Sequence, residues 1–204
     1  MVQADLAHVG QLVARARQGD RKAFDGLVEI YTPQVYSLAL RITGSREEAE
    51  DCVQDAFVRA YCALRGFRGE SAFSTWLYRV ALNVASDAAR KRSRGPLPAT
   101  DLAADGSDDP PPDLDRLARR QLADQSTPDA LVIANQRRQL ILAAIARLPE
   151  HQRTALILCD LQGLSYQEAA RIMRARIGTV KSRLNRGRLA LKDLLAPHLE
   201  LLRE

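Results

Sequence analysis

The sequence predicts an all-α protein made of two small helical domains joined by a flexible linker, with a helix-turn-helix in the C-terminal domain. Three observations lead to this prediction. Apolar residues recur at helical spacing, and helix caps and stop signals separate the runs. No stretch alternates apolar and polar residues for long enough to indicate a sheet. Composition then changes over residues 93–128, so we expect domains over 1–92 and 129–204.

The individual helices follow from their end signals. Asp20 is a suitable N-cap and Gly44 a suitable C-cap, and Pro33 is expected to kink or split the helix between them. Two Ser-x-x-Glu sequences predict capping boxes, Ser45 with Glu48 and Ser165 with Glu168. In chain order, the expected helices cover about 21–43, 46–64, 74–92, 129–148, 149–162, 166–173 and 178–195.

The segment 93–128 separates the two helical runs. It holds six prolines and, near its centre, six aspartates with no basic residue among them. This composition favours a linker with little packed structure. A surface loop within a single domain is the alternative, but loops of this length are uncommon in compact domains.

A strongly basic stretch follows the second capping box. It contains eight cations and no acid, namely Arg171, Arg174, Arg176, Lys181, Arg183, Arg186, Arg188 and Lys192. Ala170 would let two helices cross closely, and Val180 would anchor the second helix, with Ile172, Met173, Ile177 and Leu184 completing that contact. The outward face would carry Thr179, Lys181, Ser182, Arg183, Asn185 and Arg186. Such a helix suits a DNA major groove, because arginine binds guanine edges in a bidentate way. The alternative is a solvated basic helix in a bundle.

A second motif, at 67–92, interleaves aromatic and basic residues. Its rings are Phe67, Phe73, Trp76 and Tyr78, and its cations are Arg68, Arg79, Arg90, Lys91 and Arg92. Single-stranded DNA requires this mixture, because unstacked bases need flat apolar surfaces and the backbone needs cations. One helix face would present Arg79, Asn83, Ser86 and Arg90. The alternative is that the rings are ordinary core residues.

An acidic stripe precedes that motif. Asp51, Gln54, Asp55 and Val58 fall on one helix face, opposite the expected core positions. This stripe is a plausible docking face for a cationic partner helix. The spacing alone favours a solvated surface instead.

Both halves resemble the extracytoplasmic-function group of bacterial sigma factors. The segment RLPEHQRTALILCDLQGLSYQEAARIM, followed by GTVKSRLNRGRLALKDLL, is similar to region 4 of that family, and AFDGLVEIY, EEAEDCVQDAFVRAYCAL and FRGESAFSTWLYRVALNVA are similar to region 2. The resemblance departs from the family pattern at Arg174, where Gly or Asn is common, at Arg176, where Pro or Ser is common, and at Gly187, where Ala is usual.

The resemblance implies a sigma factor that binds core RNA polymerase and directs promoter-specific initiation. Duplex minus-thirty-five DNA is expected at Arg176, Gly178, Thr179, Lys181, Ser182, Arg183 and Arg186. Melted minus-ten DNA is expected at Phe67, Arg68, Ser71, Phe73, Ser74, Thr75, Trp76, Arg79, Asn83 and Arg90. Polymerase is expected at Asp51, Gln54 and Asp55, and an anti-sigma factor is implied as a further partner.

The remaining features limit the other classes of function. The net charge of +5 favours a polyanionic partner only modestly. Three cysteines without CxxC spacing predict no metal and no disulfide framework, and we expect no cofactor, no membrane span and a cytoplasmic location. A stand-alone helix-turn-helix regulator would explain only the C-terminal half. A thiol enzyme built on His151, Cys159 and Asp160 is disfavoured, because Cys159 follows ALIL and should be core.

Overall fold

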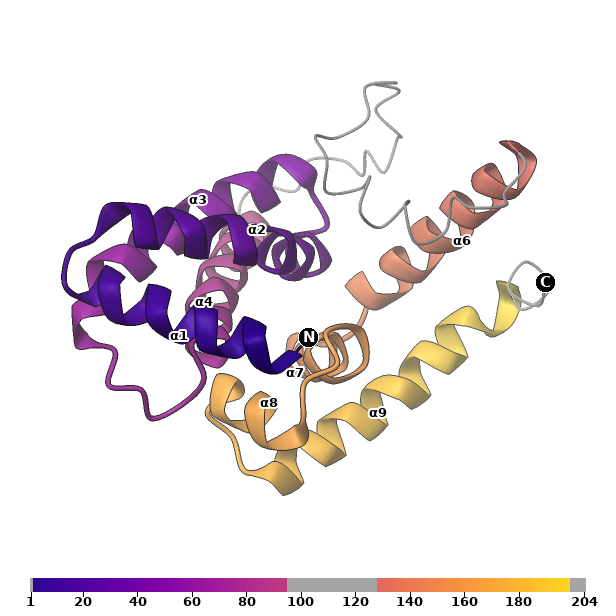
Figure 1. Ribbon diagram of the computed structural model, residues 1–204. Coiled ribbons are helices and arrows are strands. Elements are labelled where there is room, and N and C mark those ends of the chain that lie inside the picture. Colours follow the sequence, from indigo (N-terminus) through magenta and orange to yellow (C-terminus); the bar gives the residue numbers. More distant parts are fainter. Residues whose placement is uncertain (1, 95–127, 199–204) are drawn as a thin grey trace.

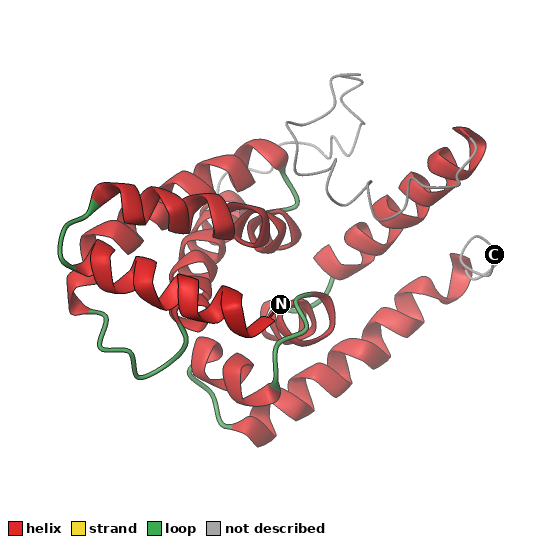
Figure 2. Cartoon of the chain, viewed as in Figure 1, coloured by secondary structure: helices red, strands yellow, loops and turns green. Residues whose placement is uncertain are grey.

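The computed structural model describes residues 2–94 and 128–198, which form helices and connecting loops without a strand (Figures 1 and 2). The predicted linker therefore lies almost wholly outside the described residues, and the predicted domain limits stay predictions. The helices of the N-terminal half are α1 (Val2–Arg17), α2 (Arg21–Thr43), α3 (Arg46–Ala63), a 3₁₀ turn (Leu64–Gly66) and α4 (Phe73–Arg94). Those of the C-terminal half are α6 (Pro128–Ala146), α7 (Glu150–Leu156), a π-helical turn (Ile157–Leu161), α8 (Tyr166–Met173), α9 (Ile177–Leu195) and a 3₁₀ turn (Ala196–His198).

In the N-terminal half, α2, α3 and α4 pack against one another and α1 covers α2. The Asp20 carboxylate caps α2 by accepting a hydrogen bond from the Ala23 N–H at 3.1 Å, and Gly44 ends the helix in the left-handed conformation at φ 73°. These two ends confirm the prediction. Pro33 lies inside α2 without splitting it, because burial of the helix on both sides of the proline outweighs one lost hydrogen bond.

The two predicted capping boxes differ in the structure. Ser165 and Glu168 form the complete reciprocal box, with the Ser165 N–H donating to the Glu168 carboxylate at 2.9 Å. Ser45 caps α3 by accepting from the Glu48 N–H at 3.3 Å, but Glu48 binds Arg92 of α4 at 3.2 Å and does not reach back. The second half of that box was predicted wrongly, because a cation from a distant helix competes for the carboxylate.

In the C-terminal half, α7 and α8 both pack on α9. Val180, Leu184 and Ile172 are buried, which confirms most of the predicted contact between α8 and α9. Ile177 was predicted to join them and is 42% exposed, because it is the first residue of α9 and lies at the open end of that helix. A β-carbon at Gly187 would lie 3.2 Å from the carbonyl oxygen of Gln152, so glycine permits the close approach of α9 to α7.

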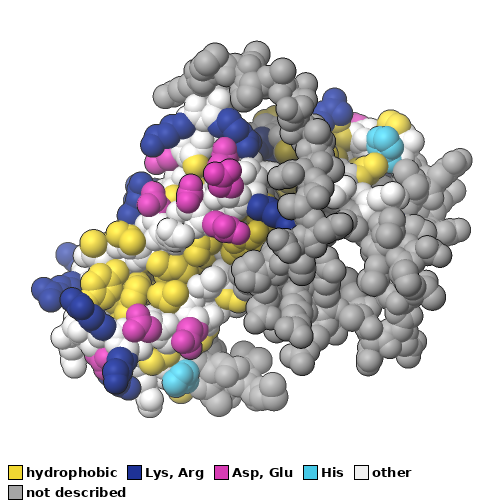
Figure 3. All heavy atoms as spheres, turned by 90° about the horizontal axis from the view of Figure 1, so that it is seen from above, with side chains coloured by type: hydrophobic (Ala, Val, Ile, Leu, Met, Phe, Trp, Pro, Cys, Tyr) yellow, Lys and Arg dark blue, Asp and Glu magenta, His cyan; other side chains and the backbone are white. Residues whose placement is uncertain are grey.

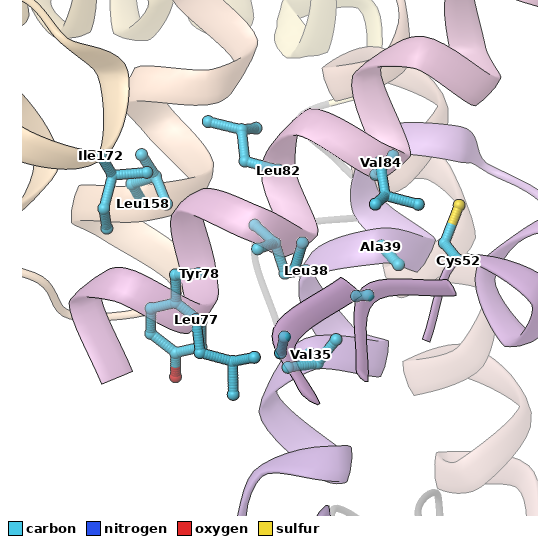
Figure 4. Close-up of a cluster of buried hydrophobic side chains, with 14 of the residues drawn as sticks. Val35, Leu38, Ala39, Cys52, Leu77, Tyr78, Leu82, Val84, Leu158 and Ile172 are labelled. Atoms are coloured by element: carbon cyan, nitrogen blue, oxygen red, sulfur yellow. The ribbon is translucent and has the colours of Figure 1, made fainter. Parts of the chain in front are cut away.

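The two halves share one hydrophobic core. Figure 4 shows Leu158 and Ile172, from the C-terminal half, on the side of α4 that carries Tyr78 and Leu82. Tyr78 is only 7% exposed, and its burial raises the pKa of the phenol to about 12. The sequence predicts two separate units, and the structure adds an apolar contact between them.

Polar contacts at the end of α2 strengthen this arrangement. The Arg92 guanidinium donates to the carbonyl of Thr43, and Arg153 of α7 donates to the carbonyl of Ile42 at 3.3 Å. Both cations therefore sit at the negative end of the α2 dipole. Burial lowers the pKa of Arg153, whose Nε is buried without a hydrogen-bond partner among the described residues.

Candidate nucleic-acid interface

The aromatic-basic motif surrounds a cavity of about 490 Å³ at the start of α4. Its lining includes six of the residues expected to hold single-stranded DNA, namely Phe67, Arg68, Ser71, Thr75, Trp76 and Arg79. Gly66, Glu70 and Arg171 complete it, and Arg171 comes from α8 of the other half. The cavity therefore brings two aromatic side chains, three guanidinium groups and two hydroxyls to one place, beside the Glu70 carboxylate, and rings with cations are the mixture that single-stranded DNA needs.

The rings of this motif divide into supporting and accessible ones. Phe67 and Phe73 are 7% and 6% exposed, whereas Trp76 is half-buried and lies 5.3 Å from Phe67 and 5.6 Å from Phe73 between ring centroids. Thr75 is buried as well. The buried rings thus form core and hold the indole at the cavity, and DNA binding by the motif stays a prediction.

The expected residues further along α4 face the other half of the protein. Asn83 and Arg90 line a second cavity of about 490 Å³ together with Arg183 of α9 and Arg174 of the turn before it. Residues expected to contact melted and duplex DNA therefore share one hollow. Arg183 therefore faces α4, whereas Arg176, Lys181 and Arg186 of the same expected duplex surface are exposed.

An ion pair between the two halves lies at this second cavity. The Arg90 guanidinium donates to both carboxylate oxygens of Glu150 at 2.8 and 3.4 Å. The bond lowers the pKa of Glu150 and raises that of Arg90. A residue expected to bind DNA phosphate thus binds a carboxylate of the C-terminal half, which the sequence could not predict across 60 positions.

The recognition helix α9 presents its cations to solvent. Arg176, Gly178, Lys181, Ser182 and Arg186 are exposed, and Thr179 and Arg183 are half-buried. The first turn of α9 contains no acid, so its positive dipole end is uncompensated. This exposure suits a DNA-facing helix, although contact with DNA stays a prediction for each residue.

Two contacts that orient α9 were not predicted. The Lys181 ammonium lies 5.5 Å from the ring centroid of Tyr166, at the first position of α8. Arg188 donates to both oxygens of Asp160 at 2.9 and 2.6 Å, which raises the pKa of Arg188 and ties α9 to the π-helical turn. The sequence could have indicated the first contact, because Lys181 and Tyr166 lie on the two helices that flank one turn, and cations often pack on aromatic rings.

The same region argues against a thiol enzyme. Asp160 is engaged by Arg188, and burial raises the pKa of Cys159, which keeps the thiol protonated. Within residues 2–94 and 128–198, no group of three or more His, Cys, Asp and Glu side chains could hold a metal ion. None of the helices described is both long and apolar enough to cross a membrane.

The acidic stripe of α3 is exposed. Asp51, Gln54 and Asp55 point to solvent, and Val58, one turn further on, is 63% exposed. α3 lies at the top of Figure 1, and the face seen from above in Figure 3 combines apolar side chains with acidic and basic ones. A single exposed valine is common on protein surfaces, so this exposure is compatible with a docking face and with a solvated one.

Comparison with protein families matches both halves of the chain. Residues 27–95 match the model of Sigma-70 region 2, and residues 138–191 match that of Sigma-70, region 4. The RNA polymerase sigma-H factor of Pseudomonas aeruginosa is 40% identical over 194 residues, which cover 95% of each chain.

This chain belongs to the sigma-70 family, in its extracytoplasmic-function group.

Further comparisons show similarity in sequence and in structure. The ECF RNA polymerase sigma-E factor of Escherichia coli K12 is 40% identical over 192 residues, covering 91% of this chain and 93% of that protein. The solved structure of CnrH in complex with the cytosolic domain of CnrY is similar, with a TM-score of 0.64, 26% identity and coverage of 91% and 96%. The sigma factor RpoE of Bartonella quintana, solved with the anti-sigma factor NepR, has a TM-score of 0.60 at 25% identity and coverage of 86% and 98%.

Proposed function

We propose that this sigma factor binds core RNA polymerase and directs promoter-specific initiation. The observation that carries this proposal is the presence of two different nucleic-acid surfaces on one chain, a ring-lined cavity on α4 and an exposed cationic helix α9. A stand-alone regulator needs only the second. RNA synthesis belongs to the polymerase, so we assign no catalytic residue to this chain, and this role places it in the cytoplasm.

The ring-lined cavity would hold the melted minus-ten strand. Trp76 offers a face on which a flipped base stacks, and Arg68 and Arg79 lie where they can hold the flanking phosphates. Stacking on an aromatic side chain offsets part of the unstacking cost of a few kcal/mol per base. Ser71 and Thr75 add hydroxyls for hydrogen bonds to the strand.

The helix α9 would enter the major groove at the minus-thirty-five element. Arg183 and Arg186 are three residues apart, so both lie on the same side of the helix. Arginine at such a position distinguishes guanine by about 1–3 kcal/mol. Thr179 and Ser182 are placed to hold phosphate near the start of the helix.

Polymerase would dock on the acidic face of α3, which we define as Asp51, Gln54, Asp55 and Val58. Carboxylates on this face match a cationic partner helix, and Val58 supplies apolar contact. An anti-sigma factor is a further partner of this function, since the similar sigma factor RpoE was solved with the anti-sigma factor NepR.

The packed arrangement of the two halves implies a rearrangement on binding. Asn83 and Arg183 line one cavity of about 490 Å³, so we expect the halves to separate when Asn83 binds a melted strand and Arg183 binds a duplex. Contacts to polymerase that are formed only after separation would supply the driving force.

Run-off transcription tests the proposal. Purified chain and core polymerase are incubated with a random promoter library, and transcripts are sequenced from their 5′ ends. A shared motif upstream of defined start sites is expected. Scattered starts, equal to those of core polymerase alone, would contradict the proposal.

Two substitutions then separate the two partners. Arg183→Ala should weaken promoter binding by about 1–3 kcal/mol and leave core polymerase affinity unchanged. Asp55→Lys should weaken polymerase binding first, because it reverses a charge on the docking face. Fluorescence titration with labelled polymerase and with a promoter duplex measures both. An equal loss of both affinities in either variant would overturn the assignment of the two faces.

A further inference from the structure

The turn between α8 and α9 contains a backbone conformation that its residue does not favour. Arg174 ends α8 with φ 49° and ψ 46°, in the left-handed region. The other left-handed positions among the described residues are all glycine, namely Gly19, Gly44, Gly69 and Gly163. A side chain with a β-carbon is strained in this conformation, and glycine avoids that strain.

The fold needs this conformation but not this side chain. The N–H groups of Arg174 and Ala175 both donate to the carbonyl of Ala170, which turns the chain into α9. Gly44 makes the equivalent cap on α2, with its N–H 2.8 Å from the carbonyl of Leu40. Glycine at position 174 would therefore form the same turn with less strain.

The guanidinium of Arg174 stabilises no part of the described structure through a polar contact. The side chain is exposed and forms no hydrogen bond or ion pair with a described residue. It lies in the acid-free stretch 171–192 and lines the same cavity as Arg183 of α9. A duplex that reaches Arg183 therefore meets the surface that carries Arg174.

We infer that Arg174 binds a backbone phosphate of the DNA duplex that α9 reads. A planar guanidinium pairs with phosphate in a bidentate manner, and an exposed side chain on a turn can reach the backbone that flanks the groove. Strain retained at one position in this way is typical of a functional residue. Arg174 adds affinity without sequence preference, in contrast to Arg183. The inference rests on the proposed contact of α9 with duplex DNA.

Opposite effects on stability and on binding test this inference. Arg174→Gly should melt roughly 2–4 °C higher, because the turn loses its strain. The same variant should bind a labelled mixed-sequence DNA duplex more weakly at low salt. The slope of log affinity against log salt should fall by about 0.9, the contribution of one phosphate contact. Arg174→Lys should retain most of that slope.

Control variants make the outcome decisive. Arg147→Ala removes an exposed arginine from the loop between α6 and α7 and should leave the slope unchanged. An equal loss in Arg147→Ala would mean a general charge effect and would overturn the inference. It is also overturned if Arg174→Gly binds the duplex as the parent does, or if that variant loses affinity only for core polymerase. If the salt slope falls in Arg183→Ala but is unchanged in Arg174→Gly, the phosphate contact of Arg174 is wrong and the proposed function is unaffected.

Discussion

The two surfaces proposed to contact DNA are built in different ways. The cavity on α4 takes its shape from core rings, since Trp76 rests on the buried Phe67 and Phe73. The surface of α9 takes its properties from exposed cations on a helix that is anchored by Val180 and Leu184 beneath it. Binding of a single strand needs a cavity of fixed shape, whereas recognition of a duplex needs long cationic side chains that extend into the groove. Stability and function should therefore be coupled in the first surface and separable in the second.

The largest expected effect is at Trp76. Trp76→Ala should lower the free energy of unfolding by about 2–4 kcal/mol, because the indole packs on two rings, and should abolish most promoter melting. Thermal unfolding and permanganate reactivity of the minus-ten region measure the two effects. Trp76→Phe should recover part of both. If Trp76→Ala opens the promoter normally at a temperature where the variant is folded, stability and function are not coupled at this cavity, and the proposed difference from α9 is wrong.

A smaller effect should separate the two capping boxes. Glu168→Ala should cost about 1 kcal/mol, because the Ser165 N–H and hydroxyl both lose the Glu168 carboxylate as their acceptor at the start of α8. Glu48→Ala removes only a bond to Arg92 at the surface and should cost about 0.5 kcal/mol or less. Urea unfolding gives both values. A larger loss in Glu48→Ala would show that the contact between α3 and α4 matters more than either cap.

The smallest effect concerns the contact between the two halves. Glu150→Gln should lower stability by less than 1 kcal/mol, because the pair with Arg90 is substantially exposed. Since Arg90 lowers the pKa of Glu150 in the folded state, the pair contributes above the ordinary pKa of 4.5 and is lost as pH falls through the lower folded value.

Small-angle scattering between pH 7 and acid checks this effect. The parent should expand as the pH falls through that window, whereas Glu150→Gln should be more open at neutral pH and change less. Asp160→Asn breaks the pair with Arg188 within the C-terminal half and should leave the separation of the halves unchanged. Identical profiles for the parent and Glu150→Gln would show that the apolar contact alone holds the halves together.

Local signals in the sequence predicted most of the fold. Asp20, Gly44 and Ser165 define helix ends through bonds to residues three or four positions away, so short-range chemistry determines them. Val180 and Leu184 follow helical spacing, and burial confirms both. The prediction that Ile177 is buried was wrong, because helical spacing does not show that α9 starts at that residue.

Contacts between distant segments could not be predicted in this way. The bond of Glu48 to Arg92 and that of Arg90 to Glu150 join residues 44 and 60 positions apart. The burial of Phe67 and Phe73 beneath Trp76 likewise depends on how three helices pack, which periodicity does not specify. The sequence thus named candidate residues of which the structure brings six together at one cavity, but their division into supporting and accessible side chains needed the structure.

The hollow shared by Asn83 and Arg183 has a consequence for how the protein behaves among chromosomes. A genome offers on the order of 10⁶–10⁹ non-specific sites that compete for any cationic protein. Because Asn83 and Arg183 face one hollow in the free protein, separation of the two halves should raise its affinity for those sites, so a free copy should be retained by them less than one bound to polymerase.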